Sequence, residues 1–471
     1  MRATGLSHGG LETHANRYHS NPDQMEIANA IVLPAMAFTT DATVVSPARR
    51  VVGRTRVPGD KSISHRYAMF GALADGLTTI TGYSPGGDCA TTLACVRALG
   101  AGVRQTGDHA FEIEGRGLRG LTAPSGALDA GNSGTTIRLM SGILAAHPMR
   151  VTMIGDRSLS KRPMQRVIEP LTRMGARFES DNGRPPLTVH GADLRPIDFI
   201  PAVPSAQVKS AVILAGLQTE GRTSVLEPAA TRDHTERALA EFGARVDVEG
   251  LKVSIEGGQR LGGRAVTVPG DISSATFWMA LAAGTPGGEV EIEGVGLNPS
   301  RTDIIDIIRR SGAAVDVALE TDGDGEPMGR LRVTFAAPRS FAIEPGDVPG
   351  IIDEIPALAA LAAMLPAGTE LTVRGAAELR HKESDRISAL ALGLRAMGTE
   401  IDEFPDGFHL RSAPLRGAIV DACDDHRLAM AFAIAATRAA GPTTITGASA
   451  VDVSYPGFFA TLDRLTRGDG R

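Results

Sequence analysis

Cysteine is scarce in this sequence. The three that occur, Cys89, Cys95 and Cys423, form no CxxC pair and follow no regular spacing. Disulfide-stapled scaffolds and structural zinc sites need such pairs, so neither organises this chain. We expect free thiols, mostly in the core, in a reducing compartment, and hence a cytoplasmic protein.

Large aromatic side chains are also few, with one Trp and an aromatic content of 4%. Glycine, at 55 residues, is abundant instead. Few cores can therefore depend on large rings, and many backbone segments must pack closely against one another.

Long apolar runs and an excess of positive charge are missing as well. No stretch reaches the length of a membrane-spanning helix, and we expect no charged-then-apolar leader. The formal net charge of −6 argues against a general role on nucleic acid or on a membrane surface, although it is compatible with a local cationic cleft. We expect no nucleic-acid or membrane partner, and a monomer.

Well-known catalytic signatures are absent too. The chain has no HExxH, no Asp-rich phosphoryl-transfer cluster and no Gly-x-x-x-x-Gly-Lys-[Ser/Thr] loop. The composition allows a Ser-His-Asp hydrolase, but no nucleophile elbow occurs. The sequence therefore requires no metal and no cofactor, and it disfavours transfer of a nucleotide phosphate.

The chain of 471 residues is too long for one core, which predicts two domains. Its content of 42% hydrophobic and 22% charged residues is typical of globular proteins. Residues 1–45 lack periodicity over most of their length, and we predict a disordered or loosely attached extension there. Its histidines, His8, His14 and His19, are better explained as solvated than as a metal site.

From residue 46 onward a unit of about 70 residues repeats six times. Each unit has an apolar helix, a short strand and a second, amphipathic helix. Five of the second helices end in a Gly beside a small residue, which is typical of a left-handed helix stop. A helix that is apolar on all sides is buried, so the first helices belong inside and the second outside. The apolar helices are predicted to begin near Ser62, Ser133, Ala206, Ser273, Asp353 and Asp425.

Two of the units share a Val-Pro-Gly-Asp-x-Ser motif, at residues 57–62 and 268–273. This internal match marks the start of the second half. We predict an α/β fold of two similar domains with three units each, with the chain crossing between domains within these motifs and the site in the cleft between them. The first domain then comprises 46–61 plus 269–471, and the second comprises 62–268.

Positively charged residues cluster at or near the starts of the apolar helices. Lys61, Ser62 and Arg66 open the first one, where free backbone N–H groups and the positive end of the helix dipole can bind an anion. The alternative is an ordinary capped helix with solvated charges. Gly134 belongs to a Gly-rich turn before the second apolar helix, where a ligand can approach the backbone N–H groups.

Further candidate anion ligands follow along the chain. Arg162 stands in a run of cations ahead of a proline that suits a first helical residue, although such a run is also typical of a solvated face. Ser205 suits an N-cap, whereas Gln207 is harder to explain as one and can hydrogen-bond a substrate. Arg232 precedes a capping pattern, and Arg427 opens the sixth apolar helix.

Two carboxylates stand among these cations. Asp353 opens the fifth apolar helix, where it either caps the helix dipole or faces the cleft as a base. Glu383 lies in sequence between Lys382 and Arg386, which fall on one helical face. These cations lower the pKa of Glu383, so it acts as an acid only if substrate anions or burial raise that pKa again. The alternative is a surface helix with salt bridges.

Five or more cationic groups that converge between two domains indicate substrates with several negative charges. The segments that carry them resemble, in the same order, those of EPSP synthase (3-phosphoshikimate 1-carboxyvinyltransferase), from about residue 46 to the end. The forms at 205–210 and 231–236 are similar to the bacterial branch called class II. The resemblance implies two domains of three βαβαββ units each, an inside-out α/β barrel. The segments that carry it are 61–66, 131–135, 161–163, 205–207, 353–354, 382–386 and 425–427.

The resemblance also implies the reaction. The 5-hydroxyl of shikimate 3-phosphate would add to phosphoenolpyruvate, and phosphate would leave a tetrahedral intermediate, on the shikimate pathway toward chorismate and the aromatic amino acids. Asp353 would take the hydroxyl proton, and Glu383, helped by Lys61, would serve as acid and base at C3. The shikimate 3-phosphate ligands would be Lys61, Ser62, Arg66, Ser205, Gln207, Arg232, Asp353 and Lys382. The phosphoenolpyruvate ligands would be Lys61, Gly134, Arg162, Gln207, Arg386 and Arg427.

Gly134 lies where the glyphosate response of that family is set. A glycine there leaves room for the inhibitor, which implies a glyphosate target. The sequence departs from the family at Val453, because some members carry a lysine at that position before the Phe/Tyr-Pro pair. One phosphoenolpyruvate contact is therefore missing or replaced.

Two alternatives stay open. UDP-N-acetylglucosamine carboxyvinyltransferase shares the fold, but it has a catalytic cysteine in a mobile loop and an Asn after its first lysine. Here Ser62 follows Lys61, and neither Cys89 nor Cys95 lies in the segment that holds the loop. The other alternative is a catalytically silent binder of phosphorylated acids, which would need neither of the two carboxylates.

Overall fold

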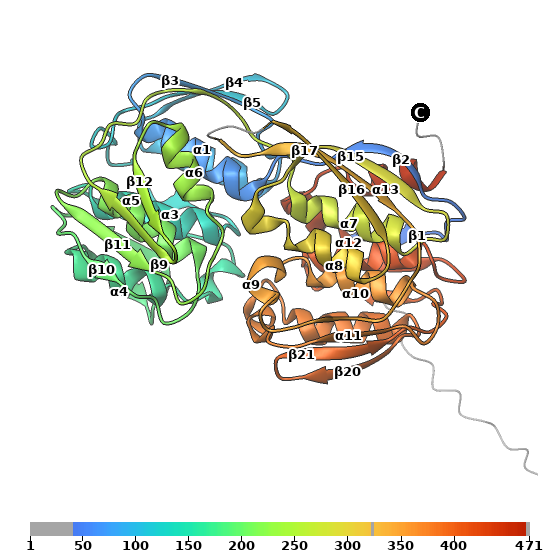
Figure 1. Ribbon diagram of the computed structural model, residues 1–471. Helices are drawn as coiled ribbons and strands as arrows, with labels where there is room; N and C mark the ends of the chain where they lie inside the picture. Colours follow the sequence, from blue (N-terminus) through green and yellow to red (C-terminus); the bar gives the residue numbers. More distant parts are fainter. Residues whose placement is uncertain (1–40, 322–324, 468–471) are drawn as a thin grey trace, which may run out of the picture. The chain divides into compact units, whose positions relative to one another are not determined.

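The computed structural model describes residues 41–321 and 325–467, and Figure 1 traces them. Helices alternate with strands of small sheets along the chain, as the repeat predicts. Within the described ranges, no helix is long and apolar enough to cross a membrane.

The predicted extension at 1–45 is wrong for its last residues. Strand β1 (Ala42–Val45) pairs antiparallel with β23 (Thr443–Thr446), and the Val45 side chain is buried. Its β-branched residues suit a strand, and their partner lies near the other end of the chain. Residues 1–40, including the histidines discussed above, lie outside the described residues.

Six small mixed sheets correspond to the six predicted repeats. Each contains one parallel pair of strands, and its other pairs are antiparallel. Three sheets have the orders β14 (Ala265–Thr267), β3 (Leu77–Thr81), β5 (Ala110–Glu114), β4 (Gly102–Gly107); β6 (Leu128–Asp129), β7 (Arg150–Ile154), β9 (Arg184–His190), β8 (Arg177–Asp181); and β10 (Asp198–Phe199), β11 (Arg222–Leu226), β13 (Lys252–Glu256), β12 (Val246–Glu249). The others are β16 (Ala314–Thr321), β17 (Met328–Thr334), β15 (Glu289–Gly296), β2 (Val52–Arg56); β18 (Phe341–Ile343), β19 (Glu370–Val373), β21 (Gly407–Arg411), β20 (Glu400–Phe404); and β1, β23, β22 (Ile419–Asp421).

The six predicted apolar helices are buried, and each begins within two residues of its predicted start. In α10 every residue is buried, because its side chains are apolar on all sides and mostly as small as alanine. The six inner helices are α1 (Lys61–Leu73), α3 (Gly134–Ala145), α5 (Ala206–Leu217), α7 (Ile272–Ala283), α10 (Ile355–Met364) and α12 (His426–Ala436).

The second helices are amphipathic and lie outside, as predicted. In α8 the four isoleucines are buried, whereas the Asp306 and Arg309 side chains are exposed. All five predicted glycine stops have a positive φ, so the left-handed helix ends are confirmed. These helices are α2 (Gly87–Ala98), α4 (Gln165–Met174), α6 (His234–Glu241), α8 (Asp303–Arg310), α11 (Arg386–Ala396) and α13 (Phe458–Arg467). Short helices are η1 (Leu159–Lys161), η2 (Pro299–Arg301), η3 (Ala377–His381), α9 (Val348–Ile351) and η4 (Ala448–Val453).

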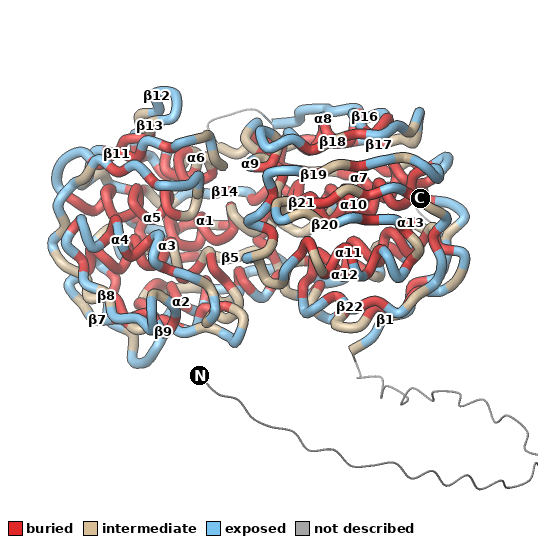
Figure 2. Tube along the Cα trace, turned by 90° about the horizontal axis from the view of Figure 1, so that it is seen from below, coloured by how far each residue is buried: buried red, intermediate tan, exposed pale blue. Residues whose placement is uncertain are grey.

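The inner helices build two separate hydrophobic cores. One core contains buried residues of α1, α3 and α5, and the other contains those of α7, α10 and α12. Figure 2 shows these helices as mainly buried segments, with exposed residues along the outer strands. The predicted fold class, two similar α/β halves of three units each, is confirmed. We call the halves the α1 core and the α7 core.

The chain passes between the cores at two segments that lie side by side. The Asp60 N–H donates to the Pro269 carbonyl at 2.7 Å, and the Asp271 N–H donates to the Pro58 carbonyl at 2.8 Å. Strand β2 therefore joins the sheet of β15 in the α7 core, while β14 joins the sheet of β3 in the α1 core. The two shared motifs of the sequence are these two crossings.

Gly59 at the first crossing has no room for a side chain, because a Cβ there would lie 1.8 Å from the Gly82 carbonyl oxygen. We expect Gly59→Ala to lower the free energy of unfolding by about 1–3 kcal/mol, since the crossing backbone must shift. Urea denaturation followed by circular dichroism measures this change. The control is Gly87→Ala, where a Cβ would meet nothing within 4 Å. Equal stability of both variants would contradict the close approach.

Candidate active site

Side-chain N-caps fix where most of the inner helices begin. The side chains of Asp60, Ser133, Ser205 and Asp425 each accept a hydrogen bond from a backbone N–H two or three residues ahead. Since each cap sets the first turn of its helix, it also sets the positions of the functional residues in that turn. The predicted site residues placed in this way are Lys61, Ser62, Gly134, Gln207 and Arg427.

Asp353 binds cations from several separate segments. Its carboxylate accepts from Arg232 at 2.7 Å and from Lys382 at 3.3 Å, and it lies 3.6 Å from Arg386. The Asp353 backbone carbonyl accepts from Arg427 at 2.7 Å. Burial alone would raise the pKa of Asp353, but these cations, Lys382 first, hold its pKa well below the ordinary value. The carboxyl of Asp353 is therefore ionised in the free protein.

Glu383 has a similar environment. Arg386 donates to one carboxylate oxygen at 2.6 Å, and Arg162 lies 3.6 Å from the other. Burial alone would raise the pKa of Glu383, but Arg386 and then Arg162 hold its pKa well below the ordinary value. Arg162 follows the buried Leu159 of the α1 core, whereas Glu383 precedes α11 on the α7 core. The contact between Arg162 and Glu383 therefore joins the two cores.

Arg386 connects the carboxylates of the site. Its Nε donates to Asp425 at 2.8 Å, and its side chain is 2% exposed beside a fully buried Asp425. Burial alone would lower the pKa of Arg386, but Asp425, Glu383 and Asp353 raise it, so the guanidinium stays charged. Among the described residues, the buried Nη1 of Arg386 has no hydrogen-bond partner. It lies 3.6 Å from the Asp353 carboxylate, within an ion pair but beyond hydrogen-bond distance.

Lys61 brings a further charge from the first turn of α1. Its Nζ donates to Asp88 at 3.0 Å. Burial alone would lower the pKa of Lys61, but Asp88 and Glu383 raise it. Lys61 is therefore an ammonium in the electrostatic range of Glu383.

Gly134, the first residue of α3, faces two arginines. A Cβ on Gly134 would lie 3.0 Å from Nη1 of Arg138 and 3.5 Å from Nη1 of Arg162. Arg138 also donates to the Gln207 side-chain oxygen at 2.6 Å. Gly134, Arg162 and Gln207, predicted separately from three segments, are thus brought together.

Among the described residues, Arg66 makes no hydrogen bond or ion pair with Asp353 or Glu383, and other groups hold its side chain. Its side chain is buried and donates to the Ser62 carbonyl at 2.8 Å, to Thr235 at 2.7 Å and to Ser210 at 2.8 Å. Positions five residues apart on a helix face in different directions, so Arg66 cannot share the orientation of Lys61. The substrate-binding roles predicted for Arg66, Ser62, Ser205 and all the other site residues stay predictions.

Three residues of the cluster were not selected from the sequence. Asp88 and Asp425 stand at helix starts, where an acidic residue is typical of a cap. Arg138 lies one turn after Gly134, and that spacing is the signal that could have identified it. The only further signal for Asp425 is its place two positions before Arg427.

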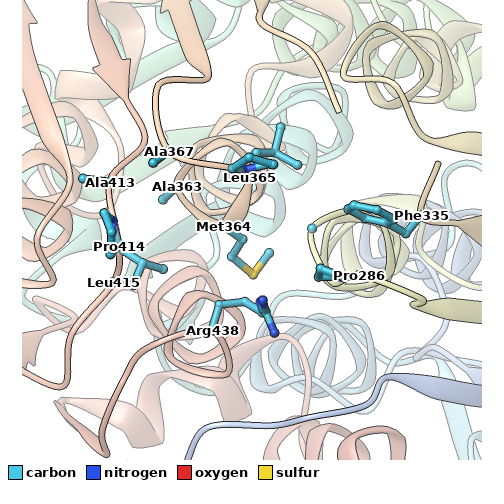
Figure 3. Close-up of a pocket in the computed structure, with 12 residues that line it drawn as sticks. Pro286, Phe335, Ala363, Met364, Leu365, Ala367, Ala413, Pro414, Leu415 and Arg438 are labelled. Atoms are coloured by element: carbon cyan, nitrogen blue, oxygen red, sulfur yellow. The ribbon is translucent and has the colours of Figure 1, made fainter. Parts of the chain in front are cut away.

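A cavity of about 190 Å³ lies at the other ends of the α7-core helices (Figure 3). Gly284 and Leu365, which cap the C-termini of α7 and α10, line it together with Arg438, which follows the C-terminus of α12. None of the predicted site residues lines this cavity. It is distinct from the charged cluster, which lies at the N-terminal ends of the inner helices.

Comparison with solved structures defines the class first. The enolpyruvyl transferase NikO from Streptomyces tendae matches with a TM-score of 0.72 at 18% identity, over 90% of this chain and 97% of that chain. An EPSP synthase from Acinetobacter baumannii matches with a TM-score of 0.82 at 41% identity, over 91% and 98%. The fold is that of the enolpyruvyl transferases.

Sequence comparison then gives the family. A family model described as EPSP synthase (3-phosphoshikimate 1-carboxyvinyltransferase) matches residues 45–462. Proteins named 3-phosphoshikimate 1-carboxyvinyltransferase from Brevibacillus brevis and a Synechococcus strain are 47% and 48% identical, covering 90% and 91% of this chain and 99% and 98% of those proteins. This chain belongs to the EPSP synthase family. The predicted family and enzyme class, EC 2.5.1.19, are thus confirmed.

Removal of Asp425 tests how strongly the cluster depends on its buried ion pair. We expect Asp425→Ala to lower the free energy of unfolding by about 3–5 kcal/mol, because Arg386 would keep a buried charge without its main partner. Urea denaturation measures this loss. The exposed pair between Asp463 and Arg467 gives the control, and Asp463→Ala should cost less than about 1 kcal/mol. A loss at Asp425 as small as that of the control would contradict the assignment.

Proposed function

We propose that this chain transfers the carboxyvinyl group of phosphoenolpyruvate to the 5-hydroxyl of shikimate 3-phosphate and releases phosphate. The reaction proceeds through a tetrahedral addition–elimination intermediate, on the route to chorismate and the aromatic amino acids. The observation that carries the proposal is one cluster in which Asp353 and Glu383 are each surrounded by cations from both cores. Such a cluster supplies acid–base groups and anion ligands at the same place.

Shikimate 3-phosphate binds on the Asp353 side of the cluster. Lys382 and Arg232 both contact Asp353, so a phosphate or carboxylate that binds them also places the hydroxyl near that base. Gln207 adds a neutral hydrogen-bonding group. The remaining ligands are Lys61, Ser62, Arg66 and Ser205.

Phosphoenolpyruvate binds on the Glu383 side. Arg162 and Arg386 both contact Glu383, and within the described part of the chain Nη1 of Arg386 makes no hydrogen bond. A carboxylate or phosphate bound there places the C3 methylene next to Glu383. Lys61, Gly134, Gln207 and Arg427 complete this set. Val453 offers no charge, so the binding of phosphoenolpyruvate depends on these residues.

The substrates supply the change in pKa that the chemistry needs. In the free protein the cations hold the pKa values of Asp353 and Glu383 low, which makes both poor proton acceptors. Anionic substrates neutralise the same cations, so both carboxyl pKa values rise once the substrates are bound. Asp353 then takes the proton of the 5-hydroxyl. Glu383 takes up a proton from solvent as its pKa rises, gives it to C3 during addition and takes a proton back from C3 during elimination, with the Lys61 ammonium beside it.

The proposed domains follow the two cores. The first domain comprises 46–61 and 269–471, extended by β1, and the second comprises 62–268. We place the boundaries at the paired crossings because the buried residues on either side belong to different cores. The cleft between these domains holds the substrates, and their closure on a ligand completes the site.

We further propose that the enzyme acts as a cytoplasmic monomer without nucleic-acid or membrane partners. One chain supplies every residue of the cluster, so the site needs no second subunit. The net charge of −6 supports the absence of a polyanionic partner.

The two alternatives lack support at the site. Burial raises the pKa of Cys89 far above its ordinary value and that of Cys95 to about 12, so neither thiol is poised as the reactive group of the UDP-N-acetylglucosamine enzyme. A silent binder has no need of two carboxylates buried among the anion ligands.

Replacement of Glu383 tests the proposed chemistry. We expect phosphate release only when both substrates are present, and we expect Glu383→Gln to lower kcat by about 100-fold or more, because Gln cannot transfer the proton at C3. The KM for shikimate 3-phosphate should change by less than about threefold. Glu400→Gln, on the exposed edge of β20, is the control and should keep full activity. An unchanged kcat in Glu383→Gln would remove this residue from the mechanism.

Replacement of Gly134 tests the predicted glyphosate response. A Cβ at this position would point toward Arg138 and Arg162, into the space that an anionic inhibitor needs. We expect wild-type protein to be sensitive to glyphosate. We expect Gly134→Ala to raise the inhibition constant by about tenfold or more while the KM for phosphoenolpyruvate rises less, since glyphosate is the longer molecule. Equal shifts for inhibitor and substrate would contradict this account.

A further inference from the structure

A buried hydrogen-bond network joins the two cores next to the proposed substrate ligands Arg232 and Asp353. His234, the first residue of α6 in the α1 core, hydrogen-bonds through Nδ1 to Glu326 at 2.7 Å. Glu326 lies just before β17 of the α7 core, and both side chains are 2% exposed. The contact is therefore shielded from water, unlike the ion pairs on the surface of the protein.

Asn298 and Ser300 complete the network from the α7 core. The Asn298 side-chain N–H₂ donates to Asp233 at 2.7 Å and to Glu326 at 2.9 Å. The Ser300 hydroxyl donates to the same Asp233 carboxylate at 3.0 Å. We call these five residues, Asp233, His234, Asn298, Ser300 and Glu326, the latch. Four hydrogen bonds of the latch connect the cores.

The latch adjoins the proposed substrate ligands on both sides. Arg232, which directly precedes Asp233, donates to Asp353. On the other side, Arg301 directly follows Ser300 and donates to the Glu354 carboxylate at 3.1 Å, and Glu354 is the residue after Asp353. Arg301 and Glu354 are both almost fully buried. Hydrogen bonds thus hold both Asp233, the neighbour of Arg232, and Glu354, the neighbour of Asp353. These bonds fix the positions of Arg232 and Asp353 relative to each other.

We propose that the latch is a positioning device for the enzyme: it holds the two cores together beside the cleft and thereby sets Arg232 against Asp353. This inference rests on the function proposed above. None of the latch residues needs to touch a substrate. The latch lowers the free energy needed to bring the two halves of the site together. When the latch is lost, substrate binding must supply that free energy, so the apparent affinity for substrate falls.

The inference predicts a change in KM rather than in the chemical step. In Glu326→Ala, His234 and Asn298 lose the carboxylate with which both form hydrogen bonds. We therefore expect the KM for shikimate 3-phosphate to rise about tenfold or more. At saturating substrates kcat should stay within about threefold of wild type. Glu326→Gln keeps one acceptor oxygen, for Asn298, and its N–H₂ can donate to Nδ1 of His234 in the other tautomer, so it should restore KM to within about threefold of the wild-type value.

The control is a partly exposed histidine–glutamate pair that does not join the two cores. Glu179 also accepts from a histidine, His190, at 2.6 Å, but both residues lie in one sheet of the α1 core. Glu179→Ala should leave both kinetic constants unchanged. If Glu326→Ala proves unstable, Asn298→Ala gives the same test, because it removes one hydrogen bond between the cores, to Asp233, and one within the α7 core, to Glu326.

Phosphate-release kinetics and small-angle scattering decide the outcome. Scattering should show that Glu326→Ala needs a higher concentration of shikimate 3-phosphate than wild type to reach compact dimensions, and that both proteins are equally compact with saturating shikimate 3-phosphate and glyphosate. A folded Glu326→Ala with wild-type KM and wild-type dimensions would overturn the latch, as would a fall in kcat at unchanged KM. Absence of phosphate release by the wild-type protein would instead reject the proposed function, and the scattering comparison would still test the latch.

Discussion

The pairing of Asp353 and Glu383 with cations from both cores is the interaction on which the rest of the structure depends. Buried charges are costly unless each has a close partner of opposite sign. Here Arg386, 2% exposed, lies among Asp425, Glu383 and Asp353. The cations can therefore stay buried, charged and fixed before any substrate binds, which is the condition for electrostatic catalysis.

The fold brings the first turns of the inner helices together. Inner helices of small side chains can pack closely, so the first turns of several helices meet at one place. The outer helices and the sheets cover these helices, as Figure 2 shows. The exchange of β2 and β14 between the cores then ties the two halves together at the paired crossings. The site is accordingly a property of the whole chain and of no single unit.

Much of this could be predicted from the sequence because it is local. A helix that is apolar on all sides can be recognised from its own residues, and so can a glycine stop after an amphipathic helix. The predicted inner helices and glycine stops are therefore all confirmed. Cations at helix starts likewise indicated the cluster. Strand β1 was missed because its partner, β23, lies near the other end of the chain, and four residues with mostly β-branched side chains are too short a signal to predict a strand by themselves.

The partners of the site residues were hidden for a related reason. Asp88 and Asp425 have the appearance of simple caps, and only the packing of distant helices shows that they hold Lys61 and Arg386. The orientation of Arg66, turned toward Ser210 and Thr235, depends in the same way on contacts between segments far apart in sequence. Spacing along the chain predicts which residues share a turn of one helix. It does not predict which residues of other segments those side chains contact.

The most direct test is a crystal structure with shikimate 3-phosphate and glyphosate bound together. The account predicts both ligands in the one cluster, with shikimate 3-phosphate on Lys382 and Arg232 beside Asp353, and glyphosate on Arg162 and Arg386 beside Glu383. A structure in which either ligand occupies another place, such as the cavity beside Arg438, while these cations keep their contacts with Asp353 and Glu383, would contradict it.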